Sequence, residues 1–236
     1  MRVLVAIPWR SQPHREYAHT LTAERYRAIL SDATIISVDT DHEPFCLAAC
    51  RNQGVRLAEK HGHQVVVLGD ADTLAEQAPL LAAIEAAQTS GLVHLPYTEY
   101  RSLRADGTVQ YRAGRALEDC DYLVVDGACS GVYVTTPATW WAHGGQDEMF
   151  RGWSPEDAAW WCAHTTLLGA EPVRHEGRVY ALHHDSPTKT GPDTEAGYGR
   201  IFRYHQAQGD PVAMRALIAE QANAVTCDKS TSAIGG

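Results

Sequence analysis

Short apolar runs alternate with longer amphipathic stretches along most of the chain. The apolar runs predict strands at 2–7, 34–39, 65–68, 92–95, 122–125, 131–134 and 178–182. Helical spacing of apolar residues predicts helices at 16–30, 44–61, 74–88 and 155–168, and two more at 193–208 and 211–221. Strands that alternate with helices are typical of an α/β fold with a mostly parallel central sheet flanked by helices.

Length and composition indicate one globular domain. The 236 residues are 44% hydrophobic, so we expect a single domain over 1–225 and a flexible tail over 226–236. The six cysteines show no CxxC pair and no zinc-ligand spacing, which indicates reduced thiols. A net charge of −9 argues against broad non-specific binding to nucleic acid or membranes. The first apolar run is too short for a signal peptide, and no run approaches the length of a membrane span, so we expect a soluble cytoplasmic protein.

Two aspartates follow the predicted strand at 65–68. Asp70 and Asp72 are two residues apart, so they project to the same side if the backbone stays extended. Ligands in open α/β sheets bind at the carboxyl ends of strands, and paired carboxylates there suit Mg²⁺ or Mn²⁺ holding a phosphate-bearing substrate. In the alternative, Thr73 and Glu76 form a capping box for the next helix and the aspartates lie in a solvated loop.

A glycine-rich and aromatic segment precedes the predicted helix at 155–168. Ser154 suits the N-cap and Pro155 the first helical position, while Glu156 and Asp157 complement the positive end of the helix. Capping alone accounts for these four residues. It does not account for Trp153, which lies among the glycines of this segment, Gly144, Gly145 and Gly152. An aromatic face beside two carboxylates is a combination that binds a sugar ring.

Taken in order, these motifs resemble those of the GT-A glycosyltransferases, most closely the galactosyltransferase type with a Gly-Trp-x-x-Glu-Asp motif. The matching segments are Ile7-Pro8-Trp9-Arg10, Asp70-Ala71-Asp72 as a DxD motif, the block 144–157, and a late histidine. They span about residues 1–205. The resemblance implies a GT-A-like nucleotide-diphospho-sugar transferase fold, with a nucleotide-sugar half over about 1–125. The acceptor and catalytic half would cover about 126–205, followed by C-terminal helices to about 222.

The resemblance also implies roles on the donor side. Asp72, with Asp70 beside it, would bind Mn²⁺ (or Mg²⁺) bridging the donor diphosphate, with His183 as the third ligand and His184 as the alternative. Where the family often has an arginine this chain has Leu47, and Arg51 is the expected substitute. The remaining donor-site residues would be Pro8, Arg10, Ala71 and Gly131.

On the acceptor side, the resemblance makes Asp157 the general base. A carboxylate within hydrogen-bond reach of the acceptor hydroxyl takes its proton, and attack opposite the leaving group inverts the anomeric centre. Retention is the alternative outcome if a different carboxylate, or none, faces the anomeric carbon. Glu156 would bind acceptor hydroxyls, and Trp153 with Gly152 would contact sugars. Ser154-Pro155 stands where the galactosyltransferases have two glycines, which stiffens the start of the helix.

The predicted function is metal-dependent transfer of a hexose from a nucleoside-diphosphate sugar, with UDP favoured, to an acceptor hydroxyl. The acceptor stays open between a glycan, a small molecule, a protein and a modified base of DNA, and so does the oligomeric state. The segment 101–115, with four arginines and one aspartate, favours DNA, whereas the net charge opposes it. One rival function is that of a nucleotidyltransferase, but the glycine-rich phosphate loop typical of that class is missing after the first strand. The other is that of a non-catalytic sugar-binding relative, and the intact carboxylates argue against it.

Overall fold

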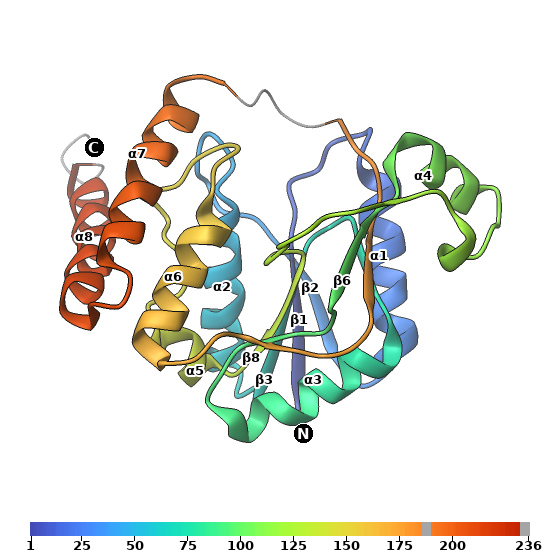
Figure 1. Cartoon of the computed structure of the whole chain (residues 1–236), viewed down its shortest axis with the longest axis horizontal. Coiled ribbons are helices and arrows are strands. Elements are labelled where there is room, and N and C mark those ends of the chain that lie inside the picture. Colours follow the sequence, from blue (N-terminus) through green and yellow to red (C-terminus); the bar gives the residue numbers. More distant parts are fainter. Residues whose placement is uncertain (186–189, 232–236) are drawn as a thin grey trace.

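The central sheet is flanked by helices on both faces (Figure 1). The structure is a computed structural model that describes residues 1–185 and 190–231, with only the backbone for 222–231. Within these ranges, six strands form the sheet in the order β2 (Thr34–Val38), β1 (Val3–Pro8), β3 (Val65–Gly69), β8 (Val132–Thr135), β5 (His94–Leu95) and β9 (Val173–Arg174). Strand β8 is antiparallel to its neighbours β3 and β5, and the other pairs are parallel. The α/β fold is as predicted, and its sheet is mixed.

A second sheet lies beside the first and was not predicted. In the described chain it has four strands in the order β4 (Thr73–Ala75), β10 (Arg178–Ala181), β6 (Glu99–Ser102) and β7 (Leu123–Val124). The alternative interpretation of Thr73 and Glu76 as a capping box is wrong, because residues 73–75 pair with β10 and helix α3 (Gln77–Ser90) begins only afterwards. The Thr73 hydroxyl instead donates to the carbonyls of Asp70 and Gly131. The arginine-rich composition of the segment 101–115 predicts a solvated hairpin or loop, and this prediction is wrong, since the segment forms helix α4 (Arg104–Arg112).

The helices form two groups around the central sheet. Helix α2 (Leu47–Lys60) covers one face, and α1 (Glu16–Ile29) and α3 lie on the other (Figure 1). On the same side as α2 lie α5 (Pro137–Ala142) and α6 (Glu156–Leu168), and beyond them α7 (Pro192–Ala207) and α8 (Pro211–Thr231) pack against α6 (Figure 1). Helices α6, α7 and α8 share a small core of their own, which includes Phe150, Ile201 and Leu217. Helices α7 and α8 therefore pack against α6 and hold its position.

Several local features bear on the sequence predictions. Gly169 ends α6 in the left-handed conformation, as expected, whereas Ser154 does not cap the backbone and its hydroxyl donates to Glu156. Helix α8 continues to Thr231, past the expected start of the tail, and residues 232–236 lie outside the described part. The five cysteines whose side chains are described are free thiols. No helix within the described ranges is both long and apolar enough to cross a membrane.

A buried histidine packs among aromatic rings between α5 and α6. His143 is fully buried against Trp140, Trp160 and His164, and neither of its ring nitrogens has a hydrogen-bond partner among the described residues. Burial, together with the neighbouring His164, lowers the pKa of His143 to about 3. The folded protein therefore holds this imidazole neutral well into the acid range.

Acid is expected to destabilise the fold through His143. The unfolded chain takes up this proton near the ordinary pKa of 6.5, so below that pH it binds more protons than the folded state and stability falls. By about pH 5 this one group should lower the free energy of unfolding by ~2 kcal/mol. Urea unfolding gives the free energy of unfolding of the wild type and of His143→Phe, each near pH 7 and near pH 5. We expect the wild type to lose ~2 kcal/mol more than the variant between the two pH values. Equal losses in the two proteins would contradict it.

Candidate functional site

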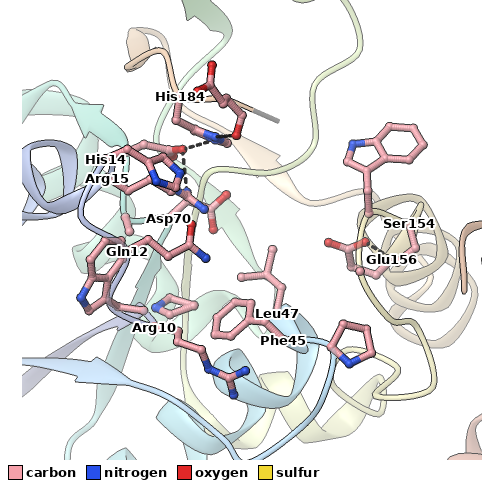
Figure 2. Close-up of a pocket in the computed structure, with 18 of the residues that line it drawn as sticks. Arg10, Gln12, His14, Arg15, Phe45, Leu47, Asp70, Ser154, Glu156 and His184 are labelled. Atoms are coloured by element: carbon pink, nitrogen blue, oxygen red, sulfur yellow. Dashed lines mark hydrogen bonds and ion pairs between the residues drawn. The ribbon is translucent and has the colours of Figure 1, made fainter. Parts of the chain in front are cut away.

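One pocket of about 750 Å³ opens where β1 and β3 end and α6 begins. In Figure 2, Asp70 and His184 lie on one side of it, Ser154 and Glu156 face them from the other, and Phe45 and Leu47 lie between. The expected donor-site residues that line it are Pro8, Arg10, Asp70, Ala71, Asp72 and His184. The expected acceptor-site residues that line it are Gly152, Trp153, Glu156 and Asp157. The two motif regions thus meet in one place.

Asp72 lies beside a histidine and an arginine. The chain turns directly after β3, and the backbone amide of Leu182 donates to the Asp72 carbonyl at 2.8 Å, which brings the end of β10 to this turn. His184 Nε2 lies 2.8 Å from Asp72 Oδ2, and the same oxygen accepts from Arg15 at 3.2 Å. The hydrogen bond to Asp72 raises the pKa of His184. His183 is exposed and does not line the pocket, so of the two histidines the structure places His184 at Asp72.

The donor groups at this turn fit a divalent ion in their chemistry. Asp72 offers a carboxylate and His184 an imidazole, ligands that suit ions such as Mn²⁺. No cluster of three or more histidine, cysteine or acidic side chains within the described residues forms a complete metal site. The Asp70 carboxylate is already bonded to Arg51 at 2.6 Å. An ion here would therefore take further ligands from water or substrate.

Arg51 lies beneath the pocket and connects its two sides. It is fully buried on α2 and does not line the pocket, so it does not lie where a nucleotide-binding arginine was expected. Its guanidinium donates to Asp70 at 2.6 Å and to Asp157 Oδ1 at 2.7 Å. Burial raises the pKa of Asp70 to about 6, although Arg51 opposes the shift. A single buried cation therefore holds one carboxylate from each motif region.

Three donors among the described residues converge on one oxygen of Asp157. Besides Arg51, the Tyr133 hydroxyl donates to Oδ1 at 2.5 Å and the Gln146 amide at 3.0 Å. These three hydrogen bonds fix the orientation of the carboxylate, and all of them end on Oδ1 and none on Oδ2. Sequence reasoning missed both Tyr133 and Gln146. The available signals were a tyrosine hydroxyl in the apolar run 131–134 and the one amide side chain of the block 144–157.

Glu156 has a different environment from its neighbour Asp157. It is buried, lines the pocket, and accepts a hydrogen bond from the Ser154 hydroxyl at 3.1 Å. Burial, and secondly the charge of Asp157, raise the pKa of Glu156 well above its ordinary value. The protonated form, which can donate a hydrogen bond, is thereby favoured. Adjacent carboxyl groups in such unlike surroundings suit different roles.

The other acids of the block 144–157 hold helices together. Asp147 is buried and pairs with Arg200 of α7, and the Tyr204 hydroxyl donates to it at 2.8 Å. Glu148 accepts from Asn52 of α2 at 2.8 Å. Neither acid lines the described pocket. This half of the block therefore fixes α7 and α2 around the start of α6.

Two further predicted donor residues have structural contacts of their own. Arg10 lines the pocket, and its guanidinium is bonded to Asp39, to Glu43 and to the carbonyl of Thr40, which orders the loop after β2. Gly131 does not line the pocket, and its carbonyl accepts the backbone amide of Asp70 at 2.8 Å. The arginines of the segment 101–115 lie outside the described pocket lining as well.

No protein-family model matches the sequence, and neither does any curated protein. Among solved structures, the catalytic domain of Drosophila β1,4-galactosyltransferase 7 in complex with xylobiose is 14% identical with a TM-score of 0.58, covering 84% of this chain and 79% of that chain. A mutant of the same Drosophila protein in complex with manganese, UDP-Gal and xylobiose is 11% identical with a TM-score of 0.56, covering 83% and 78%. At these identities the likeness establishes the fold. The chain has a GT-A-like α/β fold, as the sequence predicts.

Proposed function

We propose that the protein is a metal-dependent glycosyltransferase that moves a hexose from a UDP-sugar to an acceptor hydroxyl. The observation that carries the proposal is that Asp72, His184, Glu156 and Asp157 line one pocket, with His184 and Glu156 on opposite sides of it (Figure 2). The fold supports it, because the galactosyltransferase 7 structure with manganese and UDP-Gal has the same architecture. The donor sugar and the ion, Mn²⁺ or Mg²⁺, are part of the proposal.

On the donor side, Asp72 and His184 would hold the ion. When bound, such an ion stabilises negative charge on a leaving diphosphate. Arg15 lines the pocket, and its buried Nε has no partner among the described residues, so a phosphate oxygen of the donor would satisfy it. Asp70 acts through Arg51, which it holds beneath the pocket.

On the acceptor side, Asp157 is the proposed general base. The bond from the anomeric carbon to the diphosphate oxygen breaks, the acceptor oxygen bonds to that carbon, and the acceptor proton passes to Asp157 while the diphosphate leaves. Attack from the face opposite the diphosphate gives inversion. Tyr133 and Gln146 keep the carboxylate oriented through Oδ1. Protonated Glu156 donates a hydrogen bond to a sugar oxygen and so positions the acceptor.

A melting-temperature panel tests the proposal. Nucleoside diphosphates and nucleotide sugars are each added with Mn²⁺, with Mg²⁺ and with a chelator. A donor at about 100 times its dissociation constant stabilises by ~2.7 kcal/mol, which at this chain length raises the midpoint by about 5–10 °C. We expect the shift with uridine nucleotides and metal, and its loss with chelator or in Asp72→Asn. A flat panel from folded protein would contradict the donor assignment.

A further inference from the structure

Three exposed aromatic side chains of the described residues lead from the pocket onto helix α7. Trp153 lines the pocket, and the ring of Tyr198 lies 6.4 Å from its ring, centre to centre. Phe202 follows Tyr198 by four residues and so lies one helical turn further along the same face. These three residues are 36%, 53% and 60% exposed, in that order. We call Trp153, Tyr198 and Phe202 the aromatic ridge.

The aromatic ridge rests on a fixed support. The Thr194 hydroxyl donates to the Trp153 carbonyl at 3.2 Å, which ties the first turn of α7 to the pocket segment. Gly197 allows a close approach, since a β-carbon there would lie 3.0 Å from Cβ of Ser154. Arg200, which pairs with Asp147, anchors the buried face of α7. A ligand meeting the ridge would therefore lose little free energy in ordering it.

The charges on helix α7 disfavour an anionic ligand over this part of the ridge. The first turn of α7 carries Asp193 and Glu195, and the chain as a whole has a net charge of −9. Both arginines of α7 are paired with carboxylates, Arg200 with Asp147 and Arg203 with Glu220. Phosphate groups would thus meet acids and no available cation on this helix. The ridge suits a neutral ligand that has flat apolar faces and many hydroxyls.

We propose that the aromatic ridge binds an oligosaccharide acceptor, with the reacting sugar in the pocket beside Trp153 and the following units over Tyr198 and Phe202. This inference rests on the proposed function, because it extends the acceptor site of that reaction. Aromatic faces stack against the C–H faces of sugar rings, while nearby carboxylates accept hydroxyl hydrogen bonds. The protein then prefers acceptors of two or more units, and the ridge contributes to acceptor affinity without touching the reacting atoms.

An array of immobilised xylo-, cello-, manno- and chito-oligosaccharides of one to six units tests the inference, read with UDP and MnCl₂ present. The variant Tyr198→Ala/Phe202→Ala removes both rings of α7, and Tyr198→Phe/Phe202→Tyr keeps them as the matched control. We expect the wild type and the ring-preserving control to bind at least one series from two units upward, and the alanine variant to bind about tenfold more weakly. Where the bound series also accepts sugar, the loss falls on KM and leaves kcat.

Each result has one meaning. A melting shift with UDP and metal in all three proteins shows that fold and donor site are intact, and its absence would overturn the proposed function itself. Three outcomes would overturn the ridge assignment when that shift is present. The wild type and the alanine variant could bind the array equally, the wild type could bind single sugars as well as longer ones, or it could bind nothing on the array. A dimer in sedimentation that the alanine variant dissolves, with unchanged array binding, would assign the ridge to self-association and overturn it also.

Discussion

Replacing Asp157 by Asn is expected to lower the rate of sugar transfer by about 10²–10⁴-fold, the usual contribution of a general base. The amide has the same shape and can still accept from Arg51 and Tyr133, but it cannot take the acceptor proton. Transfer is measured as metal-dependent release of UDP with acceptor present. The metal-dependent melting shift with UDP should persist, because the change leaves Asp72 and His184 in place.

A matched control separates this effect from a general change of charge. Asp106→Asn removes a carboxylate from the exposed face of α4, outside the pocket, and should leave transfer within about twofold of wild type. If Asp157→Asn kept wild-type turnover, another group would have to be the base. If it lost donor binding together with turnover, Asp157 would be structural.

Arg51→Met is expected to have the largest effect on stability. Removing one partner of a buried ion pair leaves uncompensated charge, here on both Asp70 and Asp157, at a cost of ~3–5 kcal/mol. For a domain of this size that corresponds to a melting point lower by about 6–20 °C, measured by thermal unfolding. The double variant Arg51→Met/Asp70→Asn should recover part of the loss, since it also removes one stranded charge.

Arg56→Met provides the matched control for this prediction. Arg56 lies on the same helix, but its side chain is 49% exposed and its pair with Glu148 is open to solvent on the arginine side. Such pairs contribute about 0–1 kcal/mol, so the melting point should move by only a few degrees. Equal losses in Arg51→Met and Arg56→Met would show that the buried contacts carry no special weight.

The sequence predicted best the features that local pattern encodes. Helix α1, strand β1 and the stop of α6 at Gly169 follow from hydrophobic spacing and glycine chemistry, and the structure has them within a few residues of the predicted bounds. The local pattern of β4 instead favours the start of a helix. Its partner β10 lies far along the chain, and pairing with that strand outweighs the local helix signals. Short strands such as β9 are too brief to show any period.

The acidic residues of the candidate site were predictable from the sequence, whereas the side chains that bond to them were less so. Asp70, Asp72, Glu156 and Asp157 are recognisable as motifs and line one pocket. The burial of Arg51 depends on how α2 packs between the two motif regions, and an arginine on a helix is usually on the surface. The choice between the adjacent histidines likewise depends on the direction in which the chain leaves β10 after residue 182.

The contacts of Arg51 also limit how such a chain can be recombined. A crossover near residue 125 would take Arg51 and Asp70 from one parent, and Asp157 with its donors Tyr133 and Gln146 from the other. A parent whose equivalent of Arg51 is uncharged would leave the incoming Asp157, which is half-buried, without its counter-ion beside Asp70. In chimeras designed to exchange acceptor preference, residues 51, 70, 133, 146 and 157 should therefore all come from the same parent.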